Sequence, residues 1–502
     1  MIAGVTCESL NLHYQVVSTD LDYIVPSLKQ TANLEHPVNI DEYCVFRGLE
    51  SVRGSSIGPD GIPSWYLSSM AHLLSSPVTY LFNCSLASSY TPPHWRSSCI
   101  TPVPKILRPQ NEADFRPISI TPVLCRMLEK IVVRSYFYPI FTDPEINSAL
   151  NDQYAFRPSG STTSALIALT HGILDMLHNE PYVRLISLDF SRAFDTVRHS
   201  YLSEQLALLP LPDFLYNWIL SLLQNRQHCT KFLGQVSAFC RINASIIQGS
   251  GLGPSDFVVA ISGLKPVHCS NRLLKYADDS YILIPASAIT STSSELQNVA
   301  NWAQTCNLKL NNNKSREMVF RRPRSKLLNL PPPIPGIGRV SESVILGVTI
   351  SDRLSFDPHI DRICIKASQS LYAIRILIAH GLSGTRLFDV VRATSLARLL
   401  YASPAWYGFA KAGQRARINA IIRKMVRLKF LPADQKMFDD LCGHADSSLF
   451  SSVLHNPSHV LNCLLPPIKN VTYSLRPRSH NREIPHADAL TRCGFITRML
   501  FN

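Results

Sequence analysis

The pattern of hydrophobic and polar positions predicts short strands that alternate with helices along most of the chain. An unbroken apolar run over 183–188 predicts a buried strand, and 273–284 predicts two short strands around a tight turn. The Pro-punctuated segment 99–122 favours strands and loops over a long helix. Helical spacing predicts helices over 64–86 (broken or restarted at Pro77), 124–137, 202–224 and 294–306, and a mainly helical region from Asp357 to about residue 430. We therefore predict an α+β fold.

Acidic residues stand at the ends of the predicted strands. Asp189 directly follows the first apolar run, and Asp278 and Asp279 occupy the tip of the predicted hairpin. Two unit charges about 4 Å apart repel by about 4 kcal/mol at an effective dielectric of 20, so a cation must compensate them. Taken alone, the Asp pair is more typical of a solvated turn. Together with Asp189, the pair could place three carboxylates on one sheet edge. A two-magnesium phosphoryl-transfer site requires this arrangement.

A glycine-rich loop lies between these acids in the sequence. It is QGSGLGP, Gln248–Pro254, in which glycine permits close approach of a ligand to the backbone and the Gln248 amide can both donate and accept. The loop alone is generic, whereas its place between Asp189 and the Asp pair is much more specific. Asp195 is better explained as an acid at a helix N-terminus, where the helix dipole favours it.

The charge balance indicates an acidic partner. The 502 residues include 49 Lys and Arg against 36 Asp and Glu, a net charge of +13, and nucleic acid is the commonest such partner. Residues 411–430 carry many Lys and Arg and no acid, with apolar residues at helical spacing. We predict a basic amphipathic helix whose Arg423, Lys424 and Arg427 contact phosphates, over the alternatives of a solvated face or a membrane surface.

Cysteine usage and hydropathy predict the location of the protein. The 13 cysteines are scattered without a C-x-x-C pair, which is typical of a reduced intracellular chain. No apolar run reaches the roughly 18 residues of a membrane span, and the N-terminus lacks the basic region of a signal peptide. We expect an intracellular protein, in the cytoplasm, the nucleus or both, that is neither secreted nor bound to membranes.

One C-terminal cluster has the residue types of a metal site. It consists of Cys442, His444, His455, His459 and Cys463. Pro457 would disturb the helix that the two later histidines would need, and zinc sites usually have tighter paired spacing. Ordinary polar and core positions are therefore the better explanation, and we predict no zinc.

Several longer sequence blocks occur in one order along the chain. They are PVPK (Pro102–Lys105), DFRPISITPVL (Asp114–Leu124), QYAFRPSGSTTSAL (Gln153–Leu166), LDFSRAFDTVRH (Leu188–His199), QGSGLGP, YADD (Tyr276–Asp279), NLKLNNNK (Asn307–Lys314) and LGVTI (Leu346–Ile350). On these blocks the chain resembles the reverse transcriptases of non-LTR (LINE-like) retrotransposons, of the jockey or RTE kind. Similar texture continues through 401–409, 475–481 and 495–500, so the resemblance covers about residues 50–500.

The resemblance implies a right-hand polymerase with fingers, palm and thumb. Such an enzyme transfers deoxynucleotides from their triphosphates onto a DNA primer along an RNA template. Asp189 and Asp278 would hold two Mg2+ ions, with Mn2+ as the alternative ion and Asp279 in support. Tyr276 would contact nucleic acid. Lys314 would protonate the pyrophosphate leaving group, and a merely solvated Lys is an equal alternative.

The resemblance also implies a set of side chains that bind the nucleotide. Lys105 and Arg116 would grip the triphosphate, with a surface Lys and an Arg paired to Asp114 as the alternatives. Gln248 and Gly249 would lie at the templating base pair.

Phe194 lies five residues after Asp189, where the family has an aromatic side chain against the sugar. Its ring would exclude a ribose 2′-hydroxyl by steric clash, and a core Phe is the alternative. A viral RNA-dependent RNA polymerase is the rival class, because the spacing from Asp189 to Asp195 suits it equally. YADD and FRPIS favour reverse transcription.

We predict four regions along the chain. They are an N-terminal lead segment (1–50), reverse transcriptase fingers and palm (51–350), a helical thumb (351–430) and a basic C-terminal tail (431–502). The residues before the first block are too few for the endonuclease that such elements usually carry, and the chain ends earlier than its relatives. We expect the polymerase portion of an element, in a truncated copy. The alternative is an inactive copy that only binds nucleic acid, and the oligomeric state stays open.

Overall fold

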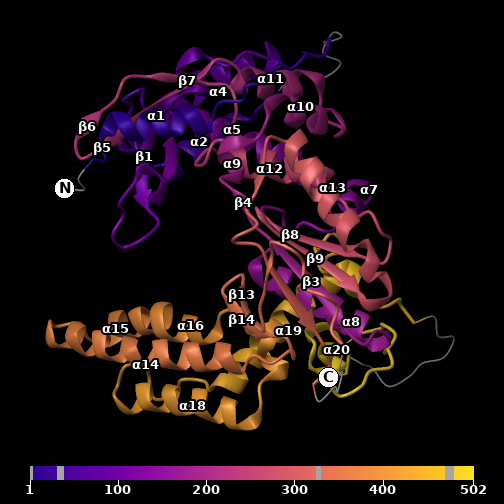
Figure 1. Ribbon diagram of the computed structural model, residues 1–502. Coiled ribbons are helices and arrows are strands. Elements are labelled where there is room, and N and C mark those ends of the chain that lie inside the picture. Colours follow the sequence, from indigo (N-terminus) through magenta and orange to yellow (C-terminus); the bar gives the residue numbers. More distant parts are fainter. Residues whose placement is uncertain (1–3, 31–38, 324–328, 470–479, 502) are drawn as a thin grey trace. The chain divides into compact units, whose positions relative to one another are not determined.

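The computed structural model describes residues 4–30, 39–323, 329–469 and 480–501, and Figure 1 shows their helices and strands. The chain forms two compact units that interleave along the sequence. Unit 1 comprises Met1–Leu150, Phe190–Lys265 and Gln297–Leu310, and unit 2 comprises Asn151–Asp189, Pro266–Leu296 and Asn311–Asn502. Both units combine sheets with helices, so the predicted α+β class is confirmed.

Unit 1 is built on a mixed sheet. Strand β1 (Ser97–Pro104) pairs antiparallel with β2 (Phe115–Ile120) and parallel with β5 (Arg226–Phe232), and β5 also pairs with β6 (Gln235–Val236) and β7 (Cys240–Ile242). Helix α1 (Cys7–Val17) packs against β5 and β7, and its Leu10 and Tyr14 share a small core with Ile100 and Phe115. The remaining elements of unit 1 are α2 (Glu42–Ser51), α3 (Ser64–Ser69), α4 (Ala71–Ala87), α5 (Val123–Val132), α6 (Tyr138–Thr142), α7 (Pro144–Ala149), α9 (Ala193–Thr196), α10 (His199–Ala207), α11 (Asp213–Leu223), α12 (Gly253–Ala260) and the pair β4 (Phe190–Ser191) and β10 (Lys309–Leu310).

Unit 2 contains the sheet that carries the strand-end acids. Its order is β12 (Gly338–Arg339), β11 (Arg316–Phe320), β3 (Val183–Leu188), β9 (Asp279–Pro285) and β8 (Arg272–Tyr276), with β3 antiparallel to both of its neighbours. Helix α8 (Thr162–Asn179) lies along this sheet (Figure 1) and contacts β3, β8 and β9. Helix α13 (Thr292–Thr305) runs from unit 2 into unit 1. The predicted strand at 183–188 and the hairpin within 273–284 are confirmed.

The C-terminal part of unit 2 is mainly helical, as the sequence predicts. Its helices share one apolar core with the sheet, to which α18 contributes the fully buried Ile418, Ile422 and Met425. The elements are β13 (Glu342–Ile345), β14 (Val348–Ser351), α14 (Asp357–Ala379), α15 (Gly384–Val391), α16 (Ala397–Leu400), α17 (Ser403–Trp406), α18 (Ala412–Arg427), α19 (Phe438–His455) and α20 (Phe495–Phe501). Most of the block at 475–481 lies outside the described residues.

The prediction that Pro77 breaks its helix is wrong. Helix α4 runs through Pro77, and the interruption lies at Met70, between α3 and α4. Pro77 removes one backbone donor opposite Leu73, which is exposed, so water can satisfy the carbonyl that is left. Helix α4 also packs against α2 and α11 through buried residues such as Phe82, and this packing outweighs the local cost.

The described residues also bear on membrane insertion and on metal binding. No described helix is long and apolar enough to cross a membrane. No described group of three or more His, Cys, Asp or Glu side chains has the arrangement of a metal site. Within the C-terminal cluster, Cys442 and His459 are buried, whereas His455 and Cys463 are not.

Candidate active site

The sheet of unit 2 brings the strand-end acids together. Leu188, the last residue of β3, pairs with Ser280 of β9, so the next position in register sets Asp189 opposite Asp279. Tyr276 and Asp279 pair across the β8–β9 turn, and Ala277, the first residue of this turn, has a φ of 53°. A two-residue turn of this kind needs a positive φ, and it leaves Asp278 at the exposed tip. The predicted juxtaposition of three acids therefore follows from strand register.

The carboxylates interact electrostatically. Desolvation is the largest cause that raises the pKa of Asp279 to about 6, and repulsion from Asp278 and Asp189 adds to it. Burial, with smaller effects of Tyr401 and Asp279, raises the pKa of the Tyr276 phenol. The site therefore has an excess of negative charge that a bound cation would relieve.

Backbone contacts hold Asp189 and connect it to the loop that carries Lys314. The Asp189 N–H donates to the Ser315 hydroxyl at 3.2 Å, and the Asn311 N–H donates to the Asp189 carbonyl at 2.8 Å. The Lys314 N–H donates to the Asn311 side chain at 3.2 Å. The Lys314 side chain itself is exposed. Asn311 belongs to the block NLKLNNNK and Ser315 directly follows it, but the sequence does not reveal their contact with Asp189.

A buried network of polar side chains stabilises the β8–β9 turn. The Gln153 Oε1 accepts the N–H groups of Ala155 at 2.8 Å and of Ala277 at 3.4 Å. Lys275, one residue before Tyr276, has its Nζ 3.1 Å from a carboxylate oxygen of Asp152, and both side chains are buried. Removing one partner of such a pair leaves an uncompensated charge, so the pair holds the end of β8 in place. The sequence block QYAFRP contained Gln153 without revealing this role.

The residues present suit the divalent ion that the sequence implies. Asp189, Asp278 and Asp279 offer hard carboxylate oxygens, the ligands that Mg2+ prefers. Protein sites for Mg2+ usually supply one or two carboxylates and leave the other positions to phosphate oxygens and water. A protein cage of three ligands is therefore not required, and the donor set fits.

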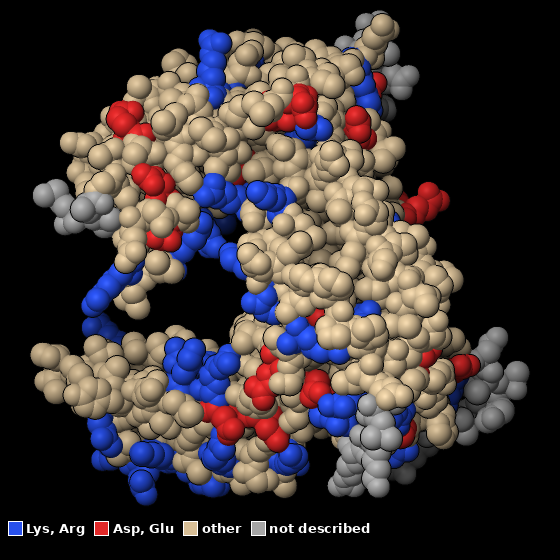
Figure 2. Space-filling view, in the orientation of Figure 1, with Lys and Arg blue, Asp and Glu red and all other residues tan. Residues whose placement is uncertain are grey.

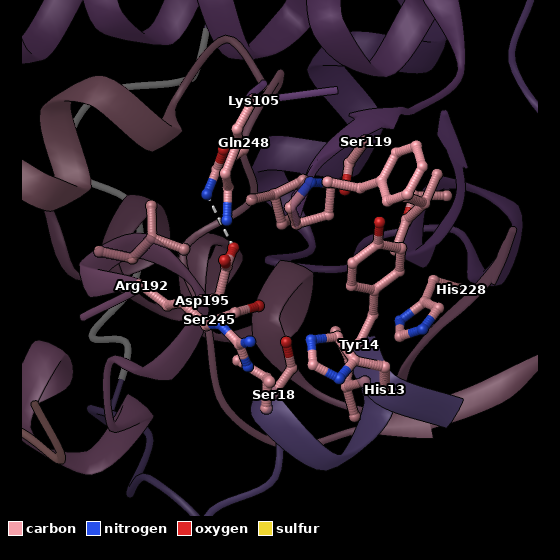
Figure 3. A pocket seen from close by; sticks show the side chains of 18 residues that line it. His13, Tyr14, Ser18, Lys105, Ser119, Arg192, Asp195, His228, Ser245 and Gln248 are labelled. Atoms are coloured by element: carbon pink, nitrogen blue, oxygen red, sulfur yellow. Dashed lines mark hydrogen bonds between the residues drawn. The ribbon is translucent and has the colours of Figure 1, made fainter. Parts of the chain in front are cut away.

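Unit 1 contains a second polar cluster, around the Gln248 amide. The Gln248 Nε2 donates to the Asp195 Oδ1 at 2.8 Å, and Asp195 is buried with 9% of its surface exposed. Figure 3 shows this hydrogen bond at one side of a pocket that Lys105, Arg192 and Tyr14 also line. Burial raises the pKa of Asp195 to about 6, against the effects of Gln248 and of nearby cations. Asp195 does lie in the first turn of the short helix α9, but its contact with Gln248 makes the dipole explanation incomplete.

The glycine-rich loop lies close to strand β2. The Ser119 N–H donates to the Gln248 carbonyl at 2.8 Å, and a Cβ on Gly249 would lie 2.3 Å from the Ser119 carbonyl oxygen. Gly249 also has a φ of 120°, which side-chain-bearing residues rarely adopt. We predicted that glycine lets a ligand approach the backbone of this loop closely. At Gly249, the group that approaches is the backbone of the protein's own strand β2.

The buried carboxylate of Glu129, on α5, holds the other end of this loop. It accepts the N–H of Gly251 in a short hydrogen bond and that of Leu252 at 3.3 Å. Burial raises the pKa of this carboxylate. Nothing in the local sequence of α5 indicates the contact, which joins residues more than a hundred positions apart.

The two proposed triphosphate-binding cations lie on β2 and at the end of β1. Lys105 is exposed, and its Nζ donates to the Ala113 carbonyl at 2.8 Å. Arg116 is exposed as well, and both cations lower the pKa of Asp195. The Asp114 carboxylate instead accepts the backbone N–H groups of Gln110 at 2.8 Å and of Asn111 at 3.2 Å.

The basic helix α18 divides into two halves. The N-cap residue and the first half of the helix form ion pairs with α14 and α19, namely Lys411 with Asp357 at 2.9 Å, Arg415 with Asp439 at 3.4 Å and Arg417 with Asp361 at 2.5 Å. In Figure 2, Lys and Arg accordingly lie beside Asp and Glu over the helical part of unit 2. Arg423, Lys424 and Arg427 are exposed, and no ion pair links them to another described residue. Phosphate contact by these three residues therefore stays a prediction.

The chain matches known proteins over the segment that contains both clusters. Residues 106–350 match the family described as "Reverse transcriptase (RNA-dependent DNA polymerase)". This segment is similar to reverse transcriptase domains. The resemblance to polymerases of non-LTR retrotransposons is confirmed by the relatives that follow.

Two of the curated relatives come from mobile elements of Drosophila melanogaster. The probable RNA-directed DNA polymerase from transposon BS is 24% identical over 432 residues, which cover 81% of this chain and 46% of the relative. The RNA-directed DNA polymerase from mobile element jockey is 27% identical over 307 residues, which cover 57% of this chain and 32% of the relative. The chain thus spans about half the length of the transposon BS relative, or less for jockey. Among solved structures, apo telomerase from Candida tropicalis aligns with a TM-score of 0.40 and 12% identity, over 78% of this chain and 68% of that one.

Proposed function

We propose that this chain catalyses RNA-directed DNA synthesis, the transfer of a deoxynucleotide from its triphosphate to the 3′ hydroxyl of a DNA primer on an RNA template. One observation carries the proposal: strand register sets Asp189 opposite Asp279, next to Asp278, at one sheet edge within the segment that matches reverse transcriptases. The protein would be the polymerase portion of a non-LTR retrotransposon and would act inside the cell, in the cytoplasm, the nucleus or both.

Unit 2 supplies the groups for phosphoryl transfer. Asp189 and Asp278 would hold two Mg2+ ions, with Asp279 beside them. Bound there, the ions would lower the charge on the phosphate oxygens and assist the attacking and leaving oxygens. Lys314, next to the contacts that hold Asp189, would donate a proton to the departing pyrophosphate. Tyr276, at the base of the turn, would contact nucleic acid.

Unit 1 supplies the groups that bind the nucleotide. Lys105 and Arg116 would bind its triphosphate, and a planar guanidinium suits a phosphate well. Gln248 and Gly249 would lie at the templating base pair, and Phe194 would exclude ribonucleotides. Along the sequence the two groups of residues adjoin, because Asp189 ends one segment of unit 2 and Phe190 begins one of unit 1. We retain residues 351–430 as the thumb, with Arg423, Lys424 and Arg427 on phosphates.

Primer extension tests this proposal. The purified chain, an RNA template with a DNA primer, Mg2+ and deoxynucleoside triphosphates should give extended primer, and Asp278→Asn should abolish extension without weakening nucleic-acid binding. Asp389→Asn is the matched control, because Asp389 is an exposed acid of unit 2 on α15. Extension by Asp278→Asn at the wild-type rate would refute the carboxylate assignment. Binding without extension by the wild type would establish the inactive alternative.

A further inference from the structure

The hydrogen bond between Asp195 and Gln248 carries an inference that rests on the proposed function. An ionised carboxylate only accepts hydrogen bonds, so it pairs with the NH2 end of an amide and never with its oxygen. With Nε2 on Asp195 at 2.8 Å, the Gln248 amide has its Oε1 left for another partner. Gln248 is half-buried, whereas Asp195 is buried, so the pair has one fixed end and one accessible end.

We propose that Asp195 is a positioning residue that fixes the orientation of the Gln248 amide, so that Gln248 presents its carbonyl oxygen to the nucleotide. A protonated Asp195 could donate to Oε1 instead, which would let the amide rotate and present its NH2 group. The Gln248 side chain would then offer a donor where the bound nucleotide meets an acceptor. Protonation of Asp195 thereby weakens nucleotide binding.

The surroundings of Asp195 set the pH at which this happens. Burial raises its pKa, and the neighbouring cations and the Gln248 amide only partly offset the shift, which leaves a pKa of about 6. The charged or titratable side chains that face it are Arg192 on its own segment, Lys105 and Arg116 near β1 and β2, and Tyr14 and His13 on α1. Burial lowers the pKa of His13, and His228 of the same pocket has its pKa lowered to about 4.

A pH profile of catalysis separates positioning from a structural role. For the wild type, kcat/KM for a deoxynucleotide should fall as the pH is lowered through about 6, mainly through KM. Asp195→Asn keeps an acceptor for Gln248 and should lose this inflection, and Asp195→Ala should lower kcat/KM about 10- to 100-fold at pH 7.5. Asp256→Asn, another buried acid of unit 1, is the control and should keep the wild-type profile. An inflection that persists in Asp195→Asn would overturn the proposal and point to Asp279, whose pKa is also raised to about 6, or to His13.

A second measurement needs no activity. In protein labelled with 15N glutamine, the side-chain signal that disappears in Gln248→Ala belongs to Gln248. Its shift should change with an inflection near pH 6 in the wild type and stay constant in Asp195→Asn. A signal that is insensitive to pH would overturn the positioning role even if primer extension succeeds. A titrating signal in a chain that extends no primer would retain the positioning and refute the polymerase activity.

Discussion

The rings of Phe194 and Phe257 stack face to face, with centroids 4.0 Å apart and planes inclined by 12°. Phe257 is buried on α12, whereas Phe194 is only half-buried. The Phe194 carbonyl also accepts the Ile246 N–H at 2.7 Å, so backbone and ring are both held. Stacking on a buried aromatic ring restricts the movement of the Phe194 ring. Exclusion by steric clash requires such a rigid group.

Phe194→Ala should therefore admit ribonucleotides, because the substitution removes the volume that would clash with a 2′-hydroxyl. Efficiency with deoxynucleotides should stay equal or fall modestly, since no attraction to the correct sugar is lost. The measurement is the ratio of kcat/KM for deoxy- and ribonucleotides, in which a loss of active protein cancels.

Phe190→Leu is the matched control for this ratio. Phe190 is a buried aromatic on β4, with its ring against Trp302 at 5.6 Å, and trimming it should cost stability but leave the sugar ratio unchanged. If Phe194→Ala behaves like this control, Phe194 is only a packing residue. A wild type that prefers ribonucleotides would contradict reverse transcription itself.

Much of the candidate site could be predicted because local pattern and register determine it. The apolar run at 183–188 is β3 to the residue, and the hairpin around Ala277 follows the alternation of its two strands. Once these strands pair, the positions of Asp189 and Asp279 follow from sheet geometry. No knowledge of distant contacts was needed for this part.

The contacts that hold the site were not predictable from pattern. Glu129 and Gly251 are 122 residues apart, and Asp189 and Ser315 are 126 apart. From helical spacing alone, Glu129 is equally well explained as an exposed polar residue of the helix. Its burial becomes apparent only in the folded structure. The contact of Asp195 with Gln248 cannot be predicted for the same reason, since the dipole explanation considers the local helix alone.

Asp279→Asn should stabilise the fold above pH 6. The pKa of Asp279 is raised from 3.8 to about 6, so the folded state favours its protonated form, and folding loses stability as the pH rises through this interval. Asparagine removes the charge and this loss. We expect a gain of about 1 kcal/mol or less at pH 7.5, because solvent screens an exposed group, and a smaller gain towards pH 4.

Thermal unfolding of both proteins across this pH range, without divalent ions, gives the measurement. Asp175→Asn serves as the control, since Asp175 is an exposed acid that pairs with Arg272 and should gain nothing. A gain that is independent of pH would show that repulsion among the carboxylates is not its source.

The halves of α18 should differ in how they affect nucleic-acid binding. Neutralising Arg423, Lys424 and Arg427 together should lower the slope of log affinity against log salt by about two to three, because each phosphate contact contributes about 0.9 on duplex nucleic acid. The measurement is binding of an RNA–DNA duplex from low to moderate salt.

The matched control is Lys411→Gln with Arg417→Gln, at the N-cap and in the first half of the same helix, where both cations are already paired with Asp357 and Asp361. These changes should alter the slope little. Equal effects per charge from the two halves would mean that the field of the whole unit, rather than specific contacts, governs the binding.

Gly249→Ala tests whether the approach of the loop to β2 matters for the reaction. The new Cβ would lie 2.3 Å from the Ser119 carbonyl oxygen, and neither partner is a flexible side chain, so the loop must move away from the strand. That movement would break the hydrogen bond from the Ser119 N–H to the Gln248 carbonyl and displace the Gln248 amide. We expect KM for the deoxynucleotide to rise about tenfold or more, since a small misplacement of a binding group is costly.

Gly234→Ala separates this effect from backbone strain. Gly234 also has a positive φ, 82°, but a Cβ there would meet nothing within 4 Å. Both variants place a side chain at a positive φ, which costs about 1 kcal/mol or more, and only Gly249→Ala adds the collision with Ser119. Gly234→Ala should therefore lower the unfolding temperature slightly and leave KM unchanged. If the two variants change KM equally, strain alone explains the result, and the contact between Gly249 and Ser119 has no part in holding Gln248 in place.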